Sequence, residues 1–200
     1  GVRYVFKKQE ILGAISLDLF AVLFGGAVAL LPVFAKEVLS VGPEGLGLLR
    51  MAPAVGAVVM AVILMLRPPM RHRGWVLLYS VAGFGACMIL FALSIDFYFS
   101  LFMLALSGAF DNVSVVIRST ILQSLTPDHM RGRVAAVNTM FIGSSNEIGA
   151  FESGVAARLL GLVPSVIFGG TMTLLIVVTT ALRAPRLRDL HLGDLEKNQA

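Results

Sequence analysis

Charged residues are scarce in this chain: Asp, Glu, Lys and Arg make up 14% of its 200 residues, and hydrophobic residues make up 57%. Ordinary soluble domains carry about 25% charged and about 45–50% apolar residues, so the composition favours a membrane protein. The net charge of +4 is not gathered in a basic stripe interleaved with aromatic residues. This argues against a protein that binds RNA or DNA.

Cysteine and histidine are also rare. Cys87 is the single cysteine, so an intramolecular disulfide is excluded. The three histidines, His72, His129 and His191, lie far apart in the sequence, and no nucleophile–base pair or metal-ligand cluster accompanies them. We therefore expect no metal, no cofactor and no enzymatic activity.

Six long apolar stretches make up most of the sequence. Each holds about 20 residues or more, the length that an α-helix needs to cross a ~30 Å hydrocarbon core. Within a bilayer the backbone must satisfy its own hydrogen bonds, so the stretches are predicted to be helices. The predicted fold is all-α, a polytopic bundle of six transmembrane helices at residues 11–35, 46–66, 75–95, 97–117, 134–157 and 159–182. Residues 1–10 then form a cytoplasmic linker and residues 183–200 a cytoplasmic tail.

The basic residues fall mainly on alternate linkers between these stretches. One side of the membrane receives thirteen of the 16 Lys and Arg, and the other side receives only Lys36, Arg50 and Arg158. By the positive-inside rule, the richer side, which carries both termini, faces the cytoplasm. Residues 94–96 and Gly161 then mark two tight turns on the opposite side.

Charged residues are unevenly shared among the six stretches. The third and the sixth carry none, so we expect these two to lie at the periphery and face lipid. The first, fourth and fifth carry charges and are expected to line an interior. This three-plus-three arrangement is the layout of one half of a major facilitator transporter.

The fourth stretch carries a polar stripe on one helix face, made of Ser107, Asp111, Ser114 and Arg118. Asp111 lies near the middle of the membrane and is the first candidate for binding a proton or a substrate. Glu147 and Glu152 in the fifth stretch are further candidates. They lie roughly 140° apart around the helix, so both cannot point into one cavity.

Charges near the cytoplasmic side suggest two ion-pair hypotheses. Asp18 and Arg118 lie at similar depths on oppositely directed helices and are predicted to pair, either as a functional contact or as a lock between helices. In the linker before the fifth stretch, Asp128 would pair with Arg131 and Arg133 in a latch that breaks when a transporter changes conformation. The alternative is a capped turn, in which Asp128 or the threonine before Pro127 caps a helix and the arginines only set topology.

Several short strings in the chain occur in the order found in a known transporter family. They are SLDLF at 16–20, GG at 25–26, LPVFA at 31–35, the pattern R-x4-Q-x3-PD-x2-RGRV at 118–134, FIGSSNEIG at 141–149, FESG at 151–154 and GG at 169–170. On these strings, which cover about residues 11–182, the chain resembles the C-terminal half of bacterial major facilitator superfamily exporters. The likeness is to the enterobactin-exporter-like, drug-efflux group.

The resemblance implies helices seven to twelve of a twelve-helix secondary transporter in the bacterial inner (plasma) membrane. Such proteins export siderophores, macrolides or other amphiphiles by alternating access, typically driven by proton entry. The chain starts at Gly1, so we expect a piece of a longer protein, whose partner is the missing N-terminal six-helix half. At residues 67–74 it departs from the superfamily's Gly-x-x-x-Asp-Arg-x-Gly-Arg pattern and lacks the Asp of the usual gating contact.

These considerations together give two sets of candidate site residues. The candidates for binding substrate or protons are Asp111, Glu147, Glu152, Asn146 and Asp18. The candidates for gating or ion pairing are Arg118, Asp128, Arg131 and Arg133. The partners expected on this interpretation are membrane lipid, a small-molecule substrate and protons, with no nucleic acid.

The competing interpretation is a non-transporting membrane scaffold or assembly subunit, or a six-helix protein that dimerises with itself. A scaffold would have little reason to keep Asp111, Glu147 and Glu152 in its spans, because charges in hydrocarbon are costly. Neutralising them should leave a scaffold intact and disable a transporter.

Overall fold

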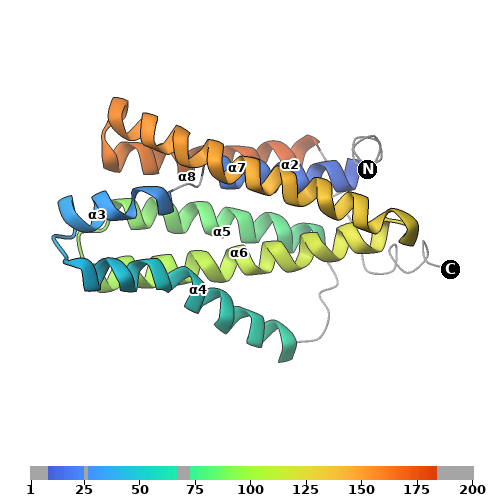
Figure 1. Ribbon diagram of the computed structural model, residues 1–200, viewed down its shortest axis with the longest axis horizontal. Coiled ribbons are helices and arrows are strands. Elements are labelled where there is room, and N and C mark those ends of the chain that lie inside the picture. Colours follow the sequence, from blue (N-terminus) through green and yellow to red (C-terminus); the bar gives the residue numbers. More distant parts are fainter. Residues whose placement is uncertain (1–8, 25–26, 67–72, 184–200) are drawn as a thin grey trace.

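The computed structural model describes residues 9–24, 27–66 and 73–183, and these segments contain helices and turns but no strand. Figure 1 shows an elongated bundle in which the long helices run lengthwise. In chain order the elements are α2 (Gln9–Phe24), the 3-10 helix η1 (Ala27–Leu30), α3 (Leu31–Glu37), α4 (Pro43–Leu66), α5 (Arg73–Leu93), α6 (Phe97–Leu125), the 3-10 helix η2 (Asp128–Met130), α7 (Arg131–Leu160) and α8 (Leu162–Arg183).

Four helices in the described part of the chain are long and apolar enough to cross a membrane. They are α4, residues 74–93 of α5, α6 and α8. The stretch predicted as a single first span instead divides into α2, η1 and α3, and α3 begins with Pro32 in its first turn. The helix α7 has 30 residues, which is ample length, but its composition is more polar. The all-helical membrane fold is therefore confirmed, and the number of six spans stays a prediction.

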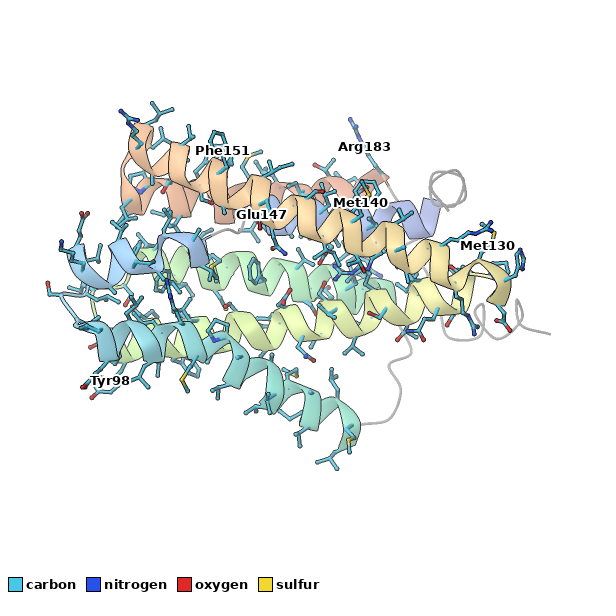
Figure 2. All side chains as sticks on the ribbon, viewed as in Figure 1. Tyr98, Met130, Met140, Glu147, Phe151 and Arg183 are labelled. Atoms are coloured by element: carbon cyan, nitrogen blue, oxygen red, sulfur yellow. The ribbon has the colours of Figure 1, made fainter. Side chains whose placement is uncertain are left out.

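Both tight turns that the sequence predicts are present. Between α5 and α6, the Asp96 side chain caps α6 by accepting a hydrogen bond from the Phe99 N–H at 2.7 Å. Between α7 and α8, Gly161 adopts φ 94°, a left-handed conformation that favours glycine. Figure 2 shows Tyr98, next to the first turn, at the opposite end of the bundle from Met130, which precedes α7.

The helices fall into two groups that enclose the interior. Figure 1 shows α2, α7 and α8 on one side and α4, α5 and α6 on the other, and α5 packs against α8 across the boundary. The two larger of three apolar cores in the described residues lie one after the other along the bundle. One is built around Leu17, Leu77 and Ile121, and the other around Phe34, Phe91 and Leu104.

The prediction that the third stretch faces lipid at the periphery stays a prediction, because the faces left uncovered in this bundle can meet either lipid or the expected second half. Half of the apolar window of α5 is buried, against 17% for α4, which is the least covered of the four candidate spans. The reason is that α5 packs against both α6 and α8, whereas α4 makes its main contact with α6 alone. An uncharged helix suits the centre of an apolar core as well as it suits lipid.

The contact between α4 and α6 depends on two glycines. A Cβ atom added at Gly56 would meet the carbonyl oxygen of Ala105, and one added at Gly108 would meet the carbonyl oxygen of Pro53. The two backbones therefore touch, as small residues permit in membrane helices. Beyond this contact α4 diverges from α6 towards its C-terminal end (Figure 1).

Candidate functional site

A cavity of about 620 Å³ lies between the two groups of helices, where η1, α4, α5, α6 and α7 approach one another. This volume falls within the range of small-molecule sites, which is roughly 300–1,000 Å³. Its wall is mostly apolar, with a few polar groups. The lining residues are Val28, Ala29, Arg50, Pro53, Phe84, Met88, Ser107, Gly108, Asp111, Asn146 and Ala150.

The polar groups of the cavity come from three helices. Ser107 and Asp111 are one turn apart on α6, Asn146 lies midway along α7, and Arg50 lies in the second turn of α4. The Ser107 hydroxyl donates to the Leu104 carbonyl at 2.7 Å, so its hydrogen is already used within the helix. The structure thus brings together two predicted site residues, Asp111 and Asn146, with one that was not predicted, Arg50.

Arg50 was missed because the sequence offered a sufficient explanation for it. As one of the three basic residues on the cation-poor side, it was counted as a topology signal. The signal that could have identified it is its position as the one charged residue of the apolar stretch 46–66. A charged residue inside a transmembrane segment suggests a functional site by default.

Asp18 lies in a second, much smaller hollow next to the cavity. Its volume is about 20 Å³, enough for one water molecule, and it is lined by Asp18, Ala21, Ser80, Val81, Phe84, Phe110, Asp111 and Ser114. Asp111 and Phe84 line both spaces. The Ser114 hydroxyl oxygen is buried without a hydrogen-bond partner in the described structure, so it is available to such a water.

The predicted ion pair between Asp18 and Arg118 is present. The Arg118 guanidinium contacts the Asp18 carboxylate between α6 and α2, and both side chains are buried. The two charges compensate each other, because an unpaired charge at this depth would be strongly destabilising. The contact fits both a functional pair and a helix-to-helix lock, and the choice between these roles stays a prediction.

The two glutamates of α7 do not line the cavity. Glu147 is exposed and Glu152 is half-buried, and Figure 2 shows Glu147 on the long helix between Met140 and Phe151. Gly143 and Gly154 face open space within the described structure. The roles predicted for Glu147 and Glu152 therefore stay predictions.

The linker before α7 contains one of the two predicted contacts of the latch. Asp128 and Arg131 form an exposed ion pair at 3.0 Å, and Arg133 is exposed with no ion pair among the described residues. Side-chain capping, one part of the alternative, is wrong: neither Pro127, at the start of η2, nor Met130, at the start of α7, provides a side-chain cap. The role of the arginines in setting topology stays a prediction. The chain enters α7 through the 3-10 turn η2, so no capping side chain stands at the first helical position.

Metal ligands are not gathered anywhere in the described segments. No group of three or more His, Cys, Asp or Glu side chains there could hold a metal ion. Cys87 is buried inside α5 as a free thiol.

Comparison with known proteins supports a transporter. A family model described as a transmembrane secretion effector, of the major facilitator type, matches residues 1–199. No curated protein and no solved structure matches the chain. Proteins of the major facilitator type are membrane transporters and are generally not enzymes. With its apolar helices and a match over almost its whole length, the chain is a multi-pass membrane protein that belongs to the transmembrane secretion effector family.

Proposed function

We propose that this chain is the C-terminal half of a secondary active transporter that exports a small amphiphilic molecule in exchange for protons. The observation that carries the proposal is the mostly apolar cavity with Asp111 in its wall, midway along a membrane bundle. Transporter sites typically lie near the middle of the membrane, between helix groups that rock against each other. On this proposal α2 with α3, and also α7, complete the six spans, and both termini face the cytoplasm of a bacterial inner membrane.

Asp111 is the proposed exchange site of the proton and the substrate. A carboxylate in a water-filled path through the membrane can bind a proton on one side and release it on the other. The substrate would displace this proton, while Phe84 and Met88 contact its apolar part. Asn146, on the facing helix, would hydrogen-bond the substrate or the protonated carboxyl group.

The test is transport by the full-length protein in proteoliposomes with an imposed proton gradient. Ethidium, rhodamine 6G and Nε-dansyl-L-lysine would serve as fluorescent amphiphilic probes. We expect the wild-type protein to move at least one probe against its gradient and Asp111→Asn to abolish this coupling. The matched control is Glu44→Gln, a change in the first turn of α4 outside the cavity, which should retain transport.

Proton-driven transport that is unchanged in Asp111→Asn would refute the assignment. A non-transporting scaffold would show no uphill movement of any probe, and Asp111→Asn would leave its folding and assembly intact.

A further inference from the structure

We infer that the Arg50 guanidinium binds an anionic group of the transported molecule, so that the cavity selects an amphiphile carrying a carboxylate or phosphate oxygen. This inference rests on the proposed function and deepens it, because it assigns a chemical class to the substrate. The neighbouring Asp111 and Asn146 would hold a cationic or hydrogen-bond-donating group of the same molecule.

Placing the charge of Arg50 inside a membrane helix carries a free-energy cost. Arg50 occupies the seventh residue after Pro43 in α4, about 10 Å along the helix, within a window of high mean hydropathy. A guanidinium in hydrocarbon is unfavourable unless it has an anion, a carbonyl group or water beside it. Arg50 forms no ion pair with any described residue, yet it is exposed at the cavity wall. Water in the cavity can solvate the guanidinium while the site is empty, and a bound ligand would supply the counter-charge.

Opposite charges lie on different helices around the cavity. Arg50 on α4 and Asp111 on α6 line the same space, but they do not pair with each other in the structure. A purely cationic ligand would satisfy Asp111 and leave the guanidinium uncompensated. A molecule with a negative group for Arg50 and a positive or donating group for Asp111 would satisfy both. Apolar side chains of α5 in the same wall, such as Phe84 and Met88, suit an apolar body.

The geometry of the guanidinium also favours an oxyanion. Its planar fork of N–H donors matches the two oxygens of a carboxylate or phosphate, which a lysine ammonium cannot do. Arg50→Lys should therefore keep the charge and lose part of the affinity. This substitution distinguishes specific recognition from a general attraction between opposite charges.

A lipid headgroup is the other source of the same chemistry. A long arginine side chain can extend from inside the hydrocarbon region to a phosphate at the interface. If Arg50 serves a lipid, its replacement should alter stability in a way that depends on anionic lipid. It should then leave probe binding unchanged.

The experiment measures equilibrium binding to the full-length protein in nanodiscs, with no proton gradient. The probes are Nε-dansyl-L-lysine, which carries both charges, its methyl ester, which lacks the carboxylate, and its Nα-acetyl derivative, which lacks the ammonium group. Each is measured in discs of phosphatidylcholine alone and in discs that also contain phosphatidylglycerol. The variants are Arg50→Ala and Arg50→Lys, and Arg158→Ala is the matched control, an exposed arginine of α7 that does not line the cavity.

We expect the wild-type protein to bind dansyl-lysine and its acetyl derivative better than the ester. Arg50→Ala should weaken binding of these two probes by roughly tenfold, the usual worth of a charge-assisted hydrogen bond, and should leave the ester unaffected. The affinity of Arg50→Lys for these two probes should lie between those of the wild type and Arg50→Ala. Arg158→Ala should bind every probe as the wild type does, in both lipid mixtures.

The inference is overturned if the wild type binds the methyl ester as tightly as the two probes that carry a carboxylate. It is equally overturned if Arg50→Ala weakens binding of the ester and of those two probes by the same factor. It is also overturned if Arg50→Ala leaves binding of all three probes unchanged and lowers only the thermal stability, measured in the same nanodiscs, in a way that depends on phosphatidylglycerol. None of these outcomes depends on uphill transport. A failure of the proposed function would appear separately, as absent proton-driven movement of every probe in proteoliposomes.

Discussion

Arg118 and Arg50 are both arginines within membrane-spanning helices, but their surroundings differ. Arg118 is buried and contacts the Asp18 carboxylate, so that charge is neutralised inside the bundle. Arg50 is exposed at a cavity wall and has no ion pair among the described residues. In the first arrangement the two charges compensate each other, and in the second the charge of Arg50 is available to a ligand. A charge in a membrane helix that is already paired within the protein can serve structure alone, whereas a charge without such a partner points to a ligand.

The small hollow beside Asp18 joins these two regions. Asp111 lines it together with Asp18, and Asp111 also lines the large cavity. The hollow beside the ion pair and the cavity therefore have Asp111 in common as a wall residue. The following predictions test whether the two regions differ in stability as their contacts imply.

The largest effect is expected from breaking the buried ion pair. Arg118→Leu should lower the free energy of unfolding by about 3–5 kcal/mol, because it leaves the Asp18 carboxylate buried without a counter-charge. The measurement is unfolding of the protein in detergent by titration with a denaturing surfactant. Arg50→Leu is the internal comparison and should change stability by roughly 0.5 kcal/mol or less.

The double variant Asp18→Leu with Arg118→Leu sharpens this prediction. Replacing both partners of a buried pair by apolar residues is often neutral or stabilising, so most of the lost stability should return. A charge swap, Asp18→Arg with Arg118→Asp, should likewise recover part of it. Swapped protein no more stable than either single variant would speak against a direct pair.

A smaller loss of stability is expected from disturbing the close contact between α4 and α6. Gly108→Ala would push the new methyl group into the Pro53 carbonyl and should cost about 1–3 kcal/mol of stability. It should also weaken probe binding, because Gly108 and Pro53 both line the cavity. Gly143→Ala on α7 is the matched control, since nothing lies within 4 Å of its added Cβ. Equal losses in the two variants would contradict the close contact.

The smallest effect is expected at the exposed pair before α7. Asp128→Asn removes a contact of 3.0 Å between side chains that are 87% and 48% exposed. Such pairs contribute roughly 0.2–1 kcal/mol and are screened by salt. Thermal unfolding at low and high salt should therefore show a small difference that fades as salt is added. A large loss that persists in high salt would mean that Asp128 has a further partner in the full-length protein.

Much of the fold could be predicted because the membrane imposes strong rules. The lengths of the apolar stretches predict the four helices that meet the criteria for spanning, and the two tight turns follow from residues 94–96 and Gly161. The Asp18–Arg118 pair followed from counting depth along two oppositely directed helices. Length, direction and charge are sufficient for predictions of this kind.

Other features depended on packing that a single sequence does not contain. The burial of α5 results from its contacts with both α6 and α8. The absence of charge in this stretch does not indicate whether it will pack against other helices or against lipid. The uncapped entry to α7 results from the 3-10 turn η2, which competes with capping by Asp128. Arg50 joined the candidate site only once α4 was placed beside α6 by Gly56 and Gly108.

The most direct test of the central claim is whether the cavity contains water within the membrane. In a Cys87→Ser background of the full-length protein, Asn146→Cys would place a thiol at the cavity wall, and Phe102→Cys would place one on the exposed apolar surface of α6. Reaction with a charged methanethiosulfonate reagent should be much faster at position 146, and dansyl-lysine should slow it. Equal, slow reaction at both positions would show that the cavity is not an aqueous site and would contradict the account.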